Sequence, residues 1–152
     1  MKKEEKYILV SEIIRKEIGD YLKNKNYVFT NTEVIFGINN SDNFHVYFTN
    51  LNKKRTIEFS YTYLNFRNEV DEYFVIFITR KPHGIYSIED ILKYEKKKYD
   101  TTKFFLLNYE GAFEQQVKQF CDFIIGLFEE YLQRWLSGEI WEEIPFDWGR
   151  YK

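Results

Sequence analysis

The stretch from Phe44 to Tyr63, FHVYFTNLNKKRTIEFSYTY, decides the fold class of this 152-residue chain. At both of its ends, large apolar residues alternate with smaller or more polar ones. Alternation with a period of two is typical of a strand that has one buried face. The polar segment between the two ends, Asn50–Lys54, is rich in turn-forming residues and too short for a crossover. The stretch therefore predicts two antiparallel strands joined by a tight turn.

Two more segments with strand-like patterns flank this hairpin. On the amino-terminal side, Val34, Phe36 and Ile38 occupy alternate positions. A turn-rich segment at 39–42 separates them from the hairpin. On the other side, residues 73–79 are apolar almost throughout, which we interpret as a central strand buried on both faces. The four strands are expected to form an antiparallel meander. Residues 102–108 are predicted to be either a fifth strand or an extended core segment.

Helical periodicity brackets the strands. Residues 4–25 repeat their apolar side chains with the 3.6-residue period of an amphipathic helix. A short helix is predicted from Ile88 to about Lys98, with Ser87 as its N-cap. A long last helix is predicted from about Ala112 to Ser137, with Gly138 as its C-cap. Gly126 lies inside it, so we expect a bend or a closely packed neighbour there.

These elements predict an α+β fold in the order α-β-β-β-β-α-(β)-α. We expect a four- to five-stranded antiparallel meander, with the amino-terminal helix and the long carboxy-terminal helix packed on one face. The 152 residues contain no linker-like segment, so 1–152 is predicted to be one domain. Residues 139–152 are interpreted as an aromatic-rich extended tail.

Composition limits the classes of function. Lysine, isoleucine, phenylalanine, tyrosine and asparagine make up 71 of 152 residues, as AT-rich codons in a bacterial genome would produce without any functional demand. The net charge of −2 argues against nucleic-acid binding. A single cysteine excludes an internal disulfide. No apolar run is long enough to span a membrane, and the amino terminus does not resemble a signal peptide, so a cytoplasmic protein without membrane association is expected.

One pair of residues has the chemistry of an acid–base site. If the two strands of the hairpin pair, His45 and Glu58 project from the less apolar face of the sheet, near Tyr47 and Ser60. A carboxylate that orients an imidazole is a common arrangement for a general base. Polar residues on an open sheet face are also what solvation alone requires. We therefore take His45, Tyr47, Glu58 and Ser60 as candidate ligand-binding residues, and a catalytic role for His45 and Glu58 as an alternative.

Other chemistry is not indicated. The two histidines and Cys121 have no metal-ligand spacing, so neither a metal nor another cofactor is expected. Cys121 lies on the apolar stripe of the last helix and is interpreted as a buried structural residue. The basic run Lys96–Lys98 is interleaved with acids and complements a helix dipole.

Charge is distributed unevenly along the chain, because residues 110–152 contain 4 basic and 9 acidic side chains. Acids and tryptophans concentrate near the carboxy terminus, and this mixture suits an interface with a basic protein. The same tail could simply cover the core of its own chain. The candidate partner-binding residues are Glu129, Glu130, Glu139, Trp141, Glu142, Glu143, Asp147 and Trp148.

No motif in the sequence is specific to one family. Small helix–meander–helix proteins of this size and acidity are frequent among bacterial immunity proteins that neutralise toxins, which is an analogy at the level of the fold. The first hypothesis is therefore a non-enzymatic protein-binding module, in one form an immunity-type inhibitor of a bacterial toxin. The alternatives are a small-molecule-binding domain and an enzyme that uses His45 and Glu58. A deep pocket lined by polar groups would favour the alternatives, and a flat acidic face would favour the first hypothesis.

Overall fold

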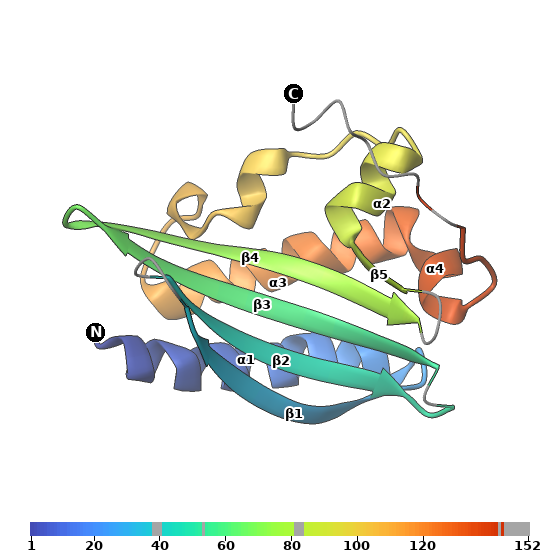
Figure 1. Ribbon diagram of the computed structural model, residues 1–152, viewed down its shortest axis with the longest axis horizontal. Helices are drawn as coiled ribbons and strands as arrows, with labels where there is room; N and C mark the ends of the chain where they lie inside the picture. Colours follow the sequence, from blue (N-terminus) through green and yellow to red (C-terminus); the bar gives the residue numbers. More distant parts are fainter. Residues whose placement is uncertain (38–40, 53, 81–83, 143, 145–152) are drawn as a thin grey trace.

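The computed structural model describes residues 1–37, 41–52, 54–80, 84–142 and 144. A five-stranded antiparallel sheet in the order β1-β2-β3-β4-β5 forms one layer, and α1 and α3 lie side by side behind it (Figure 1). The predicted α+β fold is confirmed. The elements are α1 (Lys3–Lys23), β1 (Tyr27–Phe36), β2 (Ser41–Asn50), β3 (Arg55–Phe66), β4 (Glu69–Arg80), β5 (Gly84–Ser87), α2 (Ile88–Tyr94), the 3₁₀ turns η1 (Thr101–Phe104) and η2 (Leu106–Asn108), α3 (Phe113–Tyr131) and α4 (Gln133–Ser137).

The meander follows the predicted alternation. Neighbouring strands pair antiparallel, with His45 opposite Ser60 and Tyr47 opposite Glu58. The apolar side chains of β2, β3 and β4 face the helices, where Phe59 contacts Phe128 and Phe74 stacks on Phe120 with ring centroids 4.2 Å apart. The buried apolar residues form one continuous core between the sheet and the helices. Burial of such large side chains is the main stabilising term for the fold.

The fifth strand lies elsewhere than at 102–108. That segment forms η1 and η2, and only Phe105 makes a single bridge to Tyr73. The fifth strand is β5, which pairs with the end of β4. Its four residues are too few to display a period. The expectation that residues 73–79 are buried on both faces was also wrong, because alternate residues of β4 remain half-buried on the side away from the helices.

The helix starts and stops are partly as predicted. Ser87 caps α2 by accepting a hydrogen bond from the Asp90 backbone N–H at 3.1 Å, and Gly138 adopts a left-handed conformation with φ of 84° after α4. The last helix is not continuous, because Leu132 leaves helical geometry at φ −116° and ψ 8°. The Gln133 side chain donates a hydrogen bond to the Phe128 carbonyl at 2.8 Å. This break lets α4 turn its side chains onto the core.

Gly126, where a bend or a close neighbour was expected, lies in regular helix. It is exposed, and a Cβ added there would meet no described atom within 4 Å. The Gly126→Ala substitution should therefore raise the free energy of unfolding by up to about 1 kcal/mol, because alanine loses less backbone entropy in a helix. Urea denaturation followed by circular dichroism measures this change. A lower stability would contradict the open surroundings of this residue.

Candidate functional site

Within the described part of the chain, the helices leave one face of the sheet uncovered, and Figure 1 views the molecule from that side. We call this the open face. Its residues follow from the strand register. The central ones are Asn31, Glu33 and Ile35 of β1, Asn43, His45, Tyr47 and Thr49 of β2, Thr56, Glu58, Ser60 and Thr62 of β3, and Asp71, Tyr73, Val75, Phe77 and Thr79 of β4.

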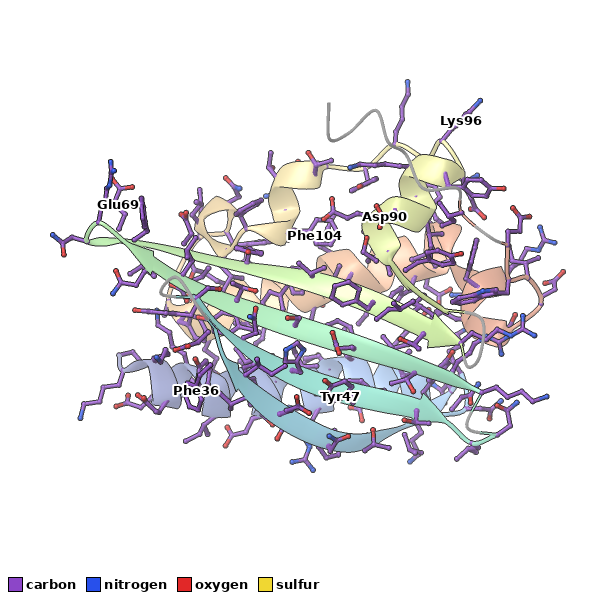
Figure 2. All side chains as sticks on the ribbon, viewed as in Figure 1. Phe36, Tyr47, Glu69, Asp90, Lys96 and Phe104 are labelled. Carbon is purple, nitrogen blue, oxygen red and sulfur yellow. The ribbon has the colours of Figure 1, made fainter. Side chains whose placement is uncertain are left out.

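The structure brings the four candidate ligand-binding residues together on this face. His45 Nδ1 lies 3.3 Å from a Glu58 carboxylate oxygen, and the His45 ring stacks on Tyr47 with centroids 5.9 Å apart. Ser60 lies opposite His45 on the neighbouring strand. Tyr47 can be found on β2 in Figure 2. Burial, and after it the nearby Glu58 carboxylate, raises the pKa of Tyr47 above its ordinary value of 10.0.

His45 is buried, with 8% of its surface exposed. Its approach to Glu58 has the distance of an ion pair but not the geometry of a hydrogen bond, and neither ring nitrogen has a hydrogen-bond partner in the described part of the chain. A buried polar group without a partner costs about 1–3 kcal/mol. The predicted approach of the His45 imidazole to the Glu58 carboxylate is thus present in the structure. Ligand binding and catalysis at these residues remain predictions.

Three hollows open on the surface, with volumes of about 430, 250 and 360 Å³, and none of these three is lined by the His45 cluster. The largest of the three is lined by four asparagines, which follow α1 or lie at and just after the end of β2, and by residues of α4. The second lies beside Trp135, between α4 and the residues that follow α2. The third lies between α1 and β1. A reaction at His45 would therefore take place on a sheet face rather than in any of these hollows.

The acidic residues near the carboxy terminus do not form one patch in the part that the structure describes. Glu129 lies 3.7 Å from Lys25, and Glu139 lies 3.2 Å from Arg134. Glu142 accepts a hydrogen bond from the Tyr94 hydroxyl, and Glu130 is exposed on α3. Of the other candidate partner-binding residues, Glu143, Asp147 and Trp148 lie outside the described residues. A partner surface here remains a prediction, with two of its acids already paired to cations.

Trp141 packs against its own chain. Its ring stacks on Tyr86 at 5.3 Å and contacts Trp135 edge-on at 5.5 Å. The backbone N–H of Ile144 donates a hydrogen bond to the Tyr86 hydroxyl at 3.0 Å. The beginning of the tail is thus held by aromatic contacts, while residues 145–152 lie outside the described residues.

The open face has a charge pattern that sequence analysis missed. Its strand positions include Glu33, Glu58, Glu69 and Asp71, and no described position that faces this way holds lysine or arginine. The four acids come from three strands, β1, β3 and β4, so counting charge along the chain does not reveal them. Combining the alternation of each strand with the antiparallel register would have done so.

The outer strand of this face, β1, is also more exposed than its pattern predicts. Val34 and Phe36 point to the helix side as expected, yet residues 30–36 are all exposed and Phe36 keeps 77% of its surface in solvent. Phe36 is labelled at the end of β1 in Figure 2. In this part of the strand a hollow separates β1 from α1, lined by Ile8, Ser11, Glu12 and Arg15 of the helix and by Thr32 of the strand. Alternation identified the orientation of these side chains but not whether anything covers them.

Two further features of the described residues bear on metal binding and thiol chemistry, namely the arrangement of possible metal ligands and the burial of Cys121. Within the described ranges, no three histidine, cysteine, aspartate or glutamate side chains come close enough together to hold a metal ion. Cys121 is fully buried, and burial raises the pKa of its thiol above the ordinary value. A nucleophilic thiol needs the opposite conditions, namely exposure and a lowered pKa.

Comparisons with protein-family models, with curated proteins and with solved structures found no match to this chain. In the part that the structure describes, no helix is both long and apolar enough to cross a membrane. The class of function therefore has to be argued from the geometry of the open face and of β1.

Proposed function

We propose that this chain is a non-enzymatic protein-binding module that recognises a basic partner protein through the open face of its sheet. The observation that carries the proposal is the charge pattern of that face. Four carboxylates occur there, and the described strand positions that share this face hold no lysine or arginine. Such a surface attracts a positively charged partner and repels acidic ones.

Half-exposed aromatic side chains accompany the carboxylates. Tyr47 of β2 and Tyr73 and Phe77 of β4 lie on the open face, and Phe105 extends it by packing its ring 5.3 Å from Tyr73. Large aromatic residues supply much of the binding energy in protein interfaces, and surrounding charges set the orientation and the association rate. Aromatic anchors beside carboxylates therefore suit a protein partner.

An immunity-type inhibitor of a bacterial toxin is one form that such a module takes. The support for this form is the analogy of size, acidity and helix–meander–helix order, together with an acidic surface that suits a basic target. It is a narrower proposal than protein binding itself, and it requires that the captured partner be a toxin that the chain inhibits.

Affinity capture from the native organism, followed by mass spectrometry, tests the proposal when wild-type and charge-reversed baits are compared. The Glu33→Lys, Asp71→Lys double variant should lose the partner, because it places two cations on the open face. Both residues are exposed, so the fold should tolerate the changes within about 0.5 kcal/mol. Asp122→Lys, on the exposed side of α3, is the control for a local charge reversal and should retain the partner.

Each other outcome has a definite meaning. Equal recovery with the open-face variant would contradict this face as the binding site. Loss of the partner with a Glu130→Lys, Glu142→Lys bait would move the site to the acidic carboxy-terminal residues. Failure of every bait to recover a saturable partner would contradict protein binding as the function.

A small-molecule-binding function is the second candidate, and one observation favours it. Both ring nitrogens of the buried His45 lack hydrogen-bond partners within the described part of the chain, which is the condition that a bound polar ligand would relieve. An enzyme that uses His45 and Glu58 would need the same residues. The His45→Ala bait separates these candidates from protein binding, since a partner recognised by charge should still be captured.

A further inference from the structure

The free edge of the sheet has the properties of a site for an added strand. Within the described sheet, β1 pairs with β2 alone, so one side of its backbone has no neighbouring strand. Natural edge strands are usually protected by lysine, proline, an inward-pointing charge or a β-bulge, and β1 has a bulge between Phe29 and Asn31 but regular pairing beyond it. Between 30 and 36 this strand contains neither lysine nor proline, and it ends with Val34, Ile35 and Phe36, all exposed.

A groove runs along the helix side of this edge. The hollow of about 360 Å³ between α1 and β1 is lined by Ile8, Ser11, Glu12 and Arg15 of α1 and by Thr32 of β1. Tyr7 and Phe44, which also line it, are nearly buried and stack with ring centroids 5.1 Å apart. The Ile8 side chain, by contrast, is 59% exposed. Apolar surface thus continues from the edge strand to the helix.

Tyr7, one of the residues that line this groove, has a hydroxyl without a partner among the described residues. Tyr7 is 7% exposed, and its buried hydroxyl makes no hydrogen bond to any described residue. An unsatisfied buried hydroxyl is uncommon in native proteins. Because this hydroxyl has no exposed surface, a strand in the groove would reach it only if the Tyr7 side chain moved.

Building on the proposed function, we infer that β1 receives a strand of the partner protein, with apolar side chains in the groove and lysine or arginine side chains on the open face. Strand addition supplies backbone hydrogen bonds along the edge, and the alternating side chains supply specificity. On the groove side, the added apolar side chains would cover Ile8, Val34 and Phe36. On the other side, the added strand would run beside Glu33.

Charge decides between a basic partner and a second copy of the chain. Glu12 in the groove and Glu33 on the open face form no ion pair with described residues, whereas the Arg15 guanidinium lies over the Phe29 ring at 4.0 Å. Two copies joined at β1 would bring two acidic open faces together, with no lysine or arginine among their described strand positions to compensate. A strand with alternating cations meets the opposite charge instead.

A synthetic strand tests this inference without the native partner. The probe is the capped peptide Lys-Val-Thr-Val-Lys-Val-Thr-Val, and its control replaces both lysines by glutamates. Each is titrated into the ¹⁵N-labelled full chain and followed by NMR and by amide hydrogen exchange. The lysine peptide should slow the exchange of every second amide between 31 and 36, where the pairing of β1 is regular, because only alternate N–H groups point outward from an edge strand. It should bind about fivefold or more tightly than the glutamate peptide.

Variants of exposed residues complete the test. Glu33→Lys should reverse the preference between the two peptides, Val34→Glu should weaken both, and the distant Asp122→Lys should change neither. Exchange that stays unchanged at millimolar peptide, with the chain folded, would overturn strand addition. A dimer in sedimentation that Val34→Glu dissociates would show that a second copy is the occupant, which also overturns it. If capture succeeds while the peptide fails, the proposed function survives and only the strand mode is lost.

Discussion

Replacing Trp135 by alanine is expected to lower the free energy of unfolding by about 3–5 kcal/mol, which is a large part of the stability of a domain of this size. Trp135 has no exposed surface and joins four parts of the chain. Its ring contacts Tyr86 of β5 edge-on at 6.4 Å and Trp141 at 5.5 Å. Its indole N–H donates a hydrogen bond to the Glu95 carboxylate at 2.7 Å. Alanine would leave both a cavity and an unpaired carboxylate.

Trp135→Phe separates these two causes. Phenylalanine keeps most of the apolar volume and removes the hydrogen bond, so we expect a smaller loss of about 1–3 kcal/mol. Urea denaturation monitored by far-ultraviolet circular dichroism measures both variants. A loss below 1 kcal/mol for Trp135→Ala would contradict the position of α4 against β5 and the carboxy-terminal residues.

Gly138→Ala is expected to cost about 2–4 kcal/mol, which is more than an added methyl group usually costs. Gly138 has φ of 84°, a conformation that strains any residue with a Cβ. The added Cβ would also overlap a terminal nitrogen of the guanidinium of Arg55, a buried residue that is 5% exposed. Backbone strain and a steric clash therefore add.

Gly84 offers a matched control. Its φ of 117° is also positive, but a Cβ there would meet no described atom within 4 Å. Gly84→Ala should thus show the backbone cost alone, about 1–2 kcal/mol. In an Arg55→Ala background the cost of Gly138→Ala should fall toward that value. Equal losses for the two glycine variants in the wild-type background would show that Arg55 does not pack against Gly138.

The sequence predicted most of the fold because its main elements are long and periodic. The alternation in β2 and β3 and the short turn between them were enough for an antiparallel hairpin with the correct faces. The helical stripe of α3 likewise identified Val117, Phe120 and Ile124 as core residues. The predictions that failed concern features that tertiary contacts determine. Leu132 breaks the last helix because α4 packs onto the core, and β5 is recognisable only by its pairing with β4.

The candidate sites were predictable only in part, for a related reason. His45 and Glu58 come from neighbouring strands with a simple register, so their approach on one face could be expected. The acids of the open face come from strands far apart in sequence, and their proximity depends on the register of the whole sheet. The exposure of Val34 and Phe36 depends on how closely α1 packs against β1, which no local pattern records.

Amide hydrogen exchange of the chain with and without its captured partner tests most directly where recognition takes place. Binding at the open face and the free edge should slow exchange in residues 28–36 of β1 and 43–49 of β2, and it should leave the outer side of α3 unchanged. Protection confined to α4 and the described residues that follow it, 139–142 and 144, would contradict this location and assign recognition to the acidic carboxy-terminal segment.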